Sequence, residues 1–113
     1  MRTVYTREAE RDLDDIIGYI ALDSPKAAED VFLAIRTSVD QLQDFPELGH
    51  PGRLAGTRER SVVSLPYVVA YRHDGDVLTI VAIFHGARDL TRALAERRKQ
   101  QKRKAPTRSK PKR

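Results

Sequence analysis

Two stretches in the first half of the chain carry apolar residues at helical spacing. After Ala9, the apolar positions Leu13, Ile16, Ile17 and Ile20 share one face of a helix with about 3.6 residues per turn. Thr6 precedes this stretch and is predicted to cap it, because its hydroxyl can accept a hydrogen bond from a free amide of the first turn. Most of the charged residues in between are expected to face solvent: Glu8, Glu10, Arg11, Asp12, Asp14 and Asp15.

A second helix is predicted from Ser24-Pro25, since serine is a typical cap and proline suits the first helical position. It should end before Pro46, because a residue that precedes proline is pushed out of the α region. Only residues 21–24 separate the two stretches, which predicts an antiparallel helical hairpin. The apolar stripe of the second helix consists of Ala28, Val31, Phe32, Ile35, Val39 and Leu42.

The rest of the chain shows the composition of β-strands. A short strand is predicted at residues 2–5, and three more at 61–63, 67–71 and 77–84, which are rich in β-branched and aromatic residues. Asp74-Gly75 predicts a tight hairpin turn between the last two strands. Residues 46–56 contain two prolines and three glycines and are predicted to form a loop.

This order of elements predicts an α+β fold (β-α-α-β-β-β), in which an N-terminal strand and an antiparallel helical hairpin pack on an antiparallel β-sheet. A chain of 113 residues suffices for one compact core. We therefore expect one folded domain over residues 1–96.

Charge separates this domain from the end of the chain. All 16 acidic residues lie in 1–96 beside 11 Lys and Arg, whereas 97–113 holds the other 10, so the domain is near −5 and the tail near +10. The tail is expected to be disordered and to attract nucleic acid without sequence preference, unless it is only a solvated end. Its first six cations are Arg97, Arg98, Lys99, Lys102, Arg103 and Lys104.

Several classes of site are disfavoured. The chain has no cysteine and three scattered histidines, so neither a disulfide nor a metal site is expected, and nothing indicates a cofactor. The longest apolar block, 77–84, is far shorter than the roughly 18 to 20 residues of a membrane span. The first residues lack the apolar core of a signal peptide, and we expect a soluble, cytoplasmic protein.

Four stretches, in this order, resemble the RelE/ParE family of toxins from type II toxin-antitoxin systems. They are Ala9-x-x-Asp12-Leu13-x-x-Ile16-x-x-Tyr19-Ile20, Phe45-Pro46-x-x-Gly49, Gly56-Thr57-Arg58-Glu59 with Pro66-Tyr67-Val68-Val69-Ala70-Tyr71-Arg72, and His85-Gly86-Ala87-Arg88-Asp89. The resemblance spans about residues 1–90 and implies a toxin that a cognate antitoxin neutralises. We also expect the helical stripe and the sheet to leave an apolar groove, which a C-terminal antitoxin segment would fill by folding on binding.

The resemblance implies two possible activities. RelE-like members cut mRNA on the ribosome with basic residues on the sheet and often an aromatic residue near the C-terminus, whereas ParE-like members inhibit DNA gyrase without a comparable catalytic set. This chain has Val68 where RelE-like nucleases tend to carry arginine, and no aromatic residue follows Phe84. Gyrase inhibition is therefore the predicted function, with ribosome-dependent endoribonuclease as the alternative and a binding module without toxicity as a third.

An RNA-cleaving site would need a group that takes the 2′-hydroxyl proton, cations for the phosphorane charge and an acid for the leaving oxygen. For the nuclease alternative, the candidate catalytic residues are His85, Arg72 and Arg88. Each also has a structural interpretation: His85 bonded to a nearby carbonyl, Arg72 paired with Asp74 or Asp76, and Arg88 paired with Asp89 or the hairpin. The candidates for binding nucleic acid or the target are Arg58, Arg60, Arg72, Arg88 and the six tail cations named above.

Overall fold

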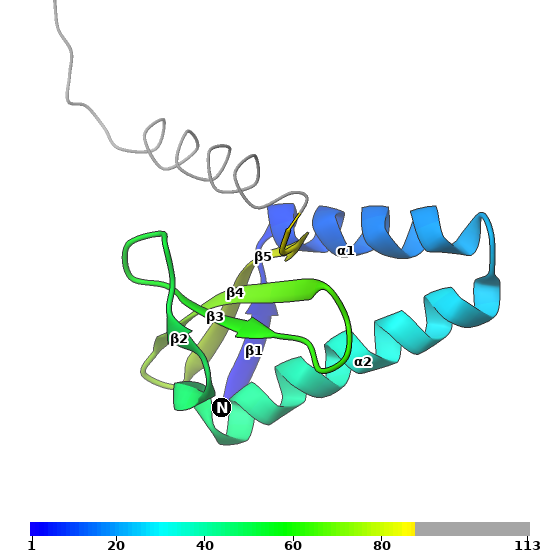
Figure 1. Ribbon diagram of the computed structural model, residues 1–113. Coiled ribbons are helices and arrows are strands. Elements are labelled where there is room, and N and C mark those ends of the chain that lie inside the picture. Colours follow the sequence, from blue (N-terminus) through cyan, green and yellow to red (C-terminus); the bar gives the residue numbers. More distant parts are fainter. Residues whose placement is uncertain (88–113) are drawn as a thin grey trace, which may run out of the picture.

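The computed structural model describes residues 1–87 and contains two helices packed on a five-stranded sheet (Figure 1). This arrangement confirms the predicted α+β class. Arg88 and the tail 97–113 lie outside the described residues. The elements are β1 (Arg2–Tyr5), α1 (Arg7–Ala21), α2 (Pro25–Asp44), a 3-10 helix (Pro46–Leu48), β2 (His50–Pro51), β3 (Arg58–Ser61), β4 (Tyr67–Asp74) and β5 (Val77–His85).

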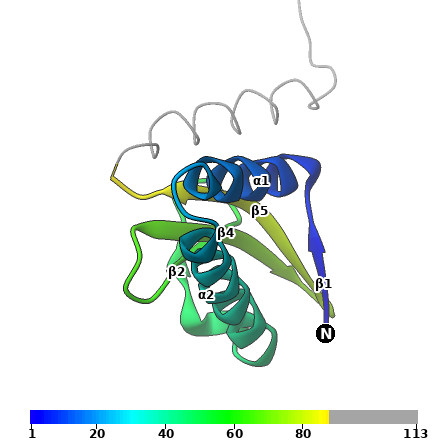
Figure 2. The same ribbon diagram turned by 90° about the vertical axis from the view of Figure 1, so that its right-hand side faces the viewer.

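Both helices begin where the sequence predicts. Thr6 Oγ1 accepts a hydrogen bond from Ala9 N at 3.0 Å, and Ser24 Oγ accepts one from Ala27 N at 3.1 Å. The second helix ends at Asp44, just before Phe45-Pro46. The hairpin that the two helices form covers one face of the sheet (Figure 2). Neither helix is long and apolar enough to cross a membrane, within the part of the chain that is described.

The sheet has the strand order β1-β5-β4-β3-β2. Strands β3, β4 and β5 form the predicted antiparallel meander. Strand β1, however, runs parallel to β5, with Arg2 opposite Val77 and Tyr5 opposite Ile80. The sheet is therefore mixed. A parallel pair needs a long connection, and the helical hairpin together with three strands provides it.

Two local predictions need correction. The strand expected at 61–63 lies instead at Arg58–Ser61, because the chain turns at Val62, whose amide donates to Tyr67 O at 2.9 Å. Residues 46–56, expected as a loop, contain the 3-10 helix and the two-residue strand β2, which pairs with β3. Neither segment has a local pattern that predicts this, since both depend on pairing with distant residues.

The main core lies between the helical hairpin and the sheet, and alternation along the strands decides which residues enter it. It contains Ala9, Ile35, Val39, Leu42, Val62, Val69, Tyr71, Leu78, Ile80 and Ile83. A smaller apolar cluster of Ala70, Ala82, Phe84 and Val68 is formed by the residues that alternate with these in β4 and β5. At Ala70/Tyr71 the register shifts by one residue in β5. This shift keeps the core residues of the two strands on one face of the sheet along the whole ladder.

Asp12 is expected to face solvent with the other charged residues of its helix. In the structure it is partly buried and faces β5 instead. Its Oδ2 accepts a hydrogen bond from Ile83 N at 3.0 Å, and Thr6 Oγ1 donates to Val81 O at 3.2 Å. The pairing of β1 with β5 ends at Tyr5–Ile80, so these side chains bond to the β5 edge beyond it. Helix α1 thereby closes part of an otherwise open strand edge.

Candidate functional site

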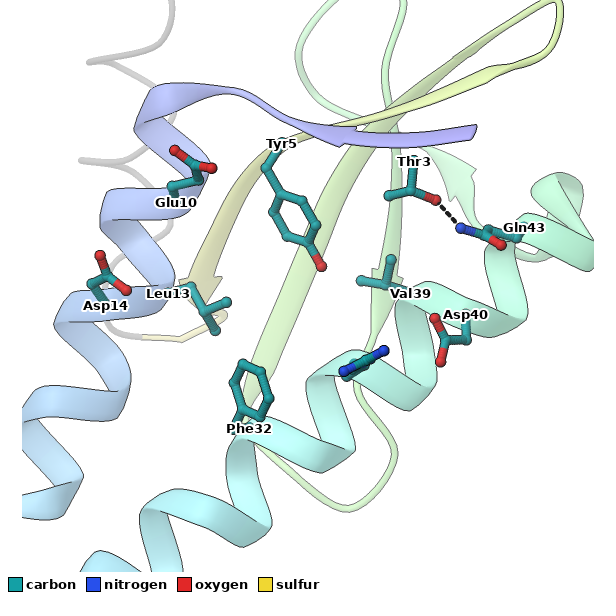
Figure 3. Close-up of a pocket in the computed structure, with 10 residues that line it drawn as sticks. Thr3, Tyr5, Glu10, Leu13, Asp14, Phe32, Val39, Asp40 and Gln43 are labelled. Carbon is teal, nitrogen blue, oxygen red and sulfur yellow. Dashed lines mark hydrogen bonds between the residues drawn. The ribbon is translucent and has the colours of Figure 1, made fainter. Parts of the chain in front are cut away.

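A groove opens between β1, α1 and α2, and we call it the hairpin groove (Figure 3). Its volume is about 660 Å³. The groove lies beside the apolar stripe of the helices and against the edge strand β1. The lining residues are Thr3, Tyr5, Glu10, Leu13, Asp14, Phe32, Arg36, Val39, Asp40 and Gln43.

The floor of the hairpin groove is apolar and packs on the core beneath it. Tyr5 and Leu13 pack against the main core cluster, of which Val39 is a buried member. Phe32 stands on α2 with 37% of its surface exposed, so its ring is available to a partner. At one end, the Gln43 amide donates a hydrogen bond to the Thr3 hydroxyl and ties α2 to β1.

Charged side chains surround this floor. Glu10 and Asp14 stand on α1, and Arg36 and Asp40 stand on α2. Burial raises the pKa of the Tyr5 hydroxyl, and the nearby Asp40 carboxylate raises it further, whereas Arg36 acts in the opposite direction. Three carboxylates and one guanidinium leave the lining with net negative charge.

The sequence did not single out these charged residues as functional. Their spacing predicts only that Glu10 and Asp14 lie on the solvent-exposed side of their helix. The sequence does contain one signal of the groove, because each helix has two charged residues beside an apolar one. Glu10 and Asp14 flank Leu13, and Arg36 and Asp40 flank Val39. Spacing alone does not tell which exposed charges two helices bring to a common groove.

The predicted basic residues are distributed over the sheet. Arg58 bonds to backbone carbonyls, with Nε and Nη2 donating to Gly49 O at 3.1 and 2.7 Å. Arg60 donates from Nη2 to Gln41 Oε1 on α2 at 3.1 Å, and its Nε is buried without a hydrogen-bond partner among the described residues. These two arginines therefore bond to the 3-10 segment and to α2.

His85 lies at one end of the β4–β5 ladder, and Arg72 lies two residues from the other end. Arg72 is paired in register with Thr79, and Tyr67 with His85. Five residues at about 3.3 Å each separate these rows by roughly 17 Å. Arg72 forms no ion pair with Asp74, Asp76 or any other residue in 1–87.

His85 contacts the ring of Tyr67 edge to face, with ring centroids 5.8 Å apart and planes inclined by 83°. The remaining site predictions, Arg88 and the tail cations Arg97, Arg98, Lys99, Lys102, Arg103 and Lys104, fall outside the described residues. Within residues 1–87, no group of three or more His, Asp or Glu side chains is arranged to hold a metal ion.

Comparison with known proteins points to one class of protein. Residues 3–90 match the model of the family described as "ParE toxin of type II toxin-antitoxin system, parDE". The chain is 42% identical over 82 residues to "Putative toxin Y4kP" of Sinorhizobium fredii, an alignment that covers 71% of this chain and 85% of that protein. It is 40% identical over 88 residues to "Toxin RelE2" of Caulobacter vibrioides, covering 77% of this chain and 97% of that one.

The fold agrees with a solved structure as well. A chain from the structure described as "Chromosomal ParDE TA system from P. aeruginosa" is 28% identical and superposes with a TM-score of 0.67. The match covers 75% of this chain and 95% of that chain. Sequence and fold therefore agree on the same class of small proteins.

Proposed function

Because this chain belongs to the RelE/ParE family of toxins from type II toxin-antitoxin systems, we propose that it arrests growth by binding DNA gyrase, without chemistry of its own. Membership of this family implies an antitoxin partner. The observation that favours gyrase binding over RNA cleavage is the wide separation of the basic side chains on the sheet.

An RNA-cleaving site must bring a proton acceptor, a cation and an acid within hydrogen-bond reach of one phosphate. The two described members of the candidate catalytic set, Arg72 and His85, are about 17 Å apart along the ladder. Arg58 already donates to the Gly49 carbonyl from two of its nitrogens. This separation favours a protein that acts by binding.

The contact between Tyr67 and His85 supports RNA cleavage as a second candidate function. The His85 imidazole stands beside the Tyr67 phenol at the end of β4 and β5. Such a pair has the chemical groups for proton transfer, although it lacks a phosphate-binding arginine among residues 1–87 at that end of the ladder. Ribosome-dependent cleavage of mRNA is the activity that this pair would serve.

Two assays with purified toxin separate the candidates. Under the gyrase proposal, the toxin inhibits supercoiling of relaxed plasmid by gyrase and leaves mRNA on translating ribosomes intact. Cells that express it should then show DNA damage. Cleaved mRNA with unchanged supercoiling would overturn the proposal in favour of the nuclease, and absence of any growth effect would indicate a binding module.

We further propose that the antitoxin uses the hairpin groove, because its apolar floor and exposed Phe32 fit the apolar face of a segment that folds on binding. The partner to test is a cognate antitoxin, which is to be sought as the product of a small neighbouring gene. Phe32→Glu should abolish its capture in a pull-down and its rescue of growth. Leu33→Glu is the matched control, since Leu33 is 51% exposed on the same helix but does not line the groove. Equal capture by both variants would place the antitoxin elsewhere.

A further inference from the structure

The hairpin groove combines an apolar floor with negative charge at its edges. Glu10, Asp14 and Asp40 are exposed, and none of them forms an ion pair with another residue of the described part of the chain. Arg36 offsets only part of their charge. The whole hairpin, residues 7–44, has ten acidic residues against four Lys and Arg, a net charge of −6. An anionic ligand such as nucleic acid is therefore repelled from this face.

Lysine and arginine side chains fit this combination of surfaces. Their aliphatic stems cover apolar surface while the charged ends stay in water. The rings of Tyr5 and Phe32 offer faces for cation–π contacts, and the carboxylates at the edges offer ion pairs. The groove thus selects a peptide segment that is rich in Lys and Arg.

The chain carries such a segment itself. Residues 97–113 contain ten Lys and Arg and no acidic residue. The described part ends at Ala87, shortly after Ile83, whose amide bonds to Asp12 of α1 at 3.0 Å. Ten residue steps from Ala87 to Arg97 reach at most about 36 Å, which exceeds the roughly 22 Å length of α1. The tail can therefore pass around α1 into the groove on its other side, at a high effective concentration.

We propose that the basic tail 97–113 binds the hairpin groove of its own chain when the antitoxin is absent. The occupied groove then holds the tail away from nucleic acid. A partner that enters the groove has to displace the tail, and the Lys and Arg side chains of the tail then become free to bind nucleic acid. This last step rests on the proposed antitoxin site, whereas the binding of the tail does not.

A spin label on the tail of the full-length protein tests the contact without antitoxin or gyrase. The chain has no cysteine, so Ser109→Cys gives a single attachment point. At low salt, the label should strongly reduce the NMR amide signals of residues 10–14 and 36–43. In 1 M NaCl, where the screening length falls to about 3 Å, these signals should recover.

A charge-matched pair of variants identifies the groove as the binding site. Combining Glu10→Gln, Asp14→Asn and Asp40→Asn should abolish the signal loss. Combining Glu47→Gln, Asp74→Asn and Asp76→Asn changes the net charge equally but lies outside the groove, and it should leave the loss in place. Equal effects of both sets, or a signal loss centred on the opposite side of α1, would overturn the proposal. A loss seen only between mixed labelled and unlabelled copies would show contact between molecules and would overturn it too. Because neither the antitoxin nor gyrase is present, none of these outcomes depends on the mode of toxicity.

Discussion

At the scale of single residues, Tyr71 connects the sheet to the segment that follows the hairpin. Its hydroxyl donates to Pro46 O at 2.6 Å and accepts from Gly49 N at 3.0 Å. Gly49 is required here, because a Cβ at this position would collide with the Tyr71 hydroxyl and lie 2.9 Å from Glu59 O. A fully buried tyrosine thus satisfies one backbone group of the 3-10 helix and one of the residue that follows it.

Tyr71→Phe should destabilise the protein by about 1–3 kcal/mol, because it leaves the buried Gly49 amide without its acceptor. Urea unfolding measures the change. Tyr67→Phe is the control, since no hydrogen bond of the Tyr67 hydroxyl to another described residue is found, and it should cost no more than about 0.5 kcal/mol. Equal losses would show that the hydroxyl of Tyr71 is not what stabilises this segment.

His85→Ala should leave gyrase inhibition and growth arrest largely intact, because an inhibitor that only binds loses one contact among many. A nuclease that uses His85 would instead lose about 100-fold or more in cleavage rate. Growth assays and supercoiling assays on the variant measure this. Loss of toxicity with fold and antitoxin binding preserved would move the assignment to the nuclease.

At the scale of elements, α1 does more than cover the core. The side chains of Thr6 and Asp12 bond to β5 beyond the point where β1 ends. The same helix supplies Glu10, Leu13 and Asp14 to the hairpin groove on its other side. One amphipathic helix therefore fixes both the strand edge and the groove.

Asp12→Ala should cost about 1–3 kcal/mol, since it removes the charged acceptor of the Ile83 amide. Hydrogen exchange at Ile83 should accelerate in the variant. Asp15→Ala on the same helix changes charge equally at an exposed position and should stay within about 0.5 kcal/mol of the wild type. An unchanged exchange rate at Ile83 in Asp12→Ala would contradict the edge-closing role.

Gly18→Ala should stabilise α1 by about 0.5–1 kcal/mol. Glycine is a poor helix former, and a Cβ added at this exposed position meets nothing within 4 Å. The midpoint of thermal unfolding should rise. A lower midpoint would contradict the expectation that a methyl group at position 18 fits the helix without a clash.

At the scale of the whole molecule, charge is divided between opposed parts. The helical hairpin has a net charge of −6 and the tail 97–113 about +10, while residues 48–87 are near neutral. Such a division allows the tail to bind either the hairpin of its own chain or nucleic acid. It also makes contacts that involve either part strongly dependent on salt.

Removal of residues 97–113 should leave the unfolding midpoint nearly unchanged, because β1 to β5 and both helices lie within residues 1–87. In the Glu10→Gln, Asp14→Asn, Asp40→Asn background, in which the groove no longer holds the tail, the shortened chain should bind DNA or RNA more weakly than the full-length chain, with a flatter dependence of affinity on salt, since fewer counterions are released. Titrations of labelled DNA at several salt concentrations measure both. Unfolding of the shortened chain, or an unchanged affinity and salt slope, would refute the separation into domain and tail.

The helices, the meander and the family could all be predicted from local features of the amino-acid sequence. Thr6 and Ser24-Pro25 define the helix starts because a cap acts within a few residues along the chain. The hairpin between β4 and β5 was predicted within one residue, with Gly75 and Asp76 as its two connecting residues and Gly75 at φ +55°. These features depend on neighbours in sequence, and so a local pattern suffices to predict them.

The places where the charged residues act depend on contacts that form only in the folded domain. Arg58 lies in a strand and bonds to the Gly49 carbonyl because β3 pairs with β4, although its sequence has little strand propensity. Asp12 bonds to a residue 71 positions away, and Glu10 and Asp40 meet at one groove only because two helices pack on β1. Such positions are set by hydrogen bonds and packing between distant segments, whose geometry no local periodicity contains.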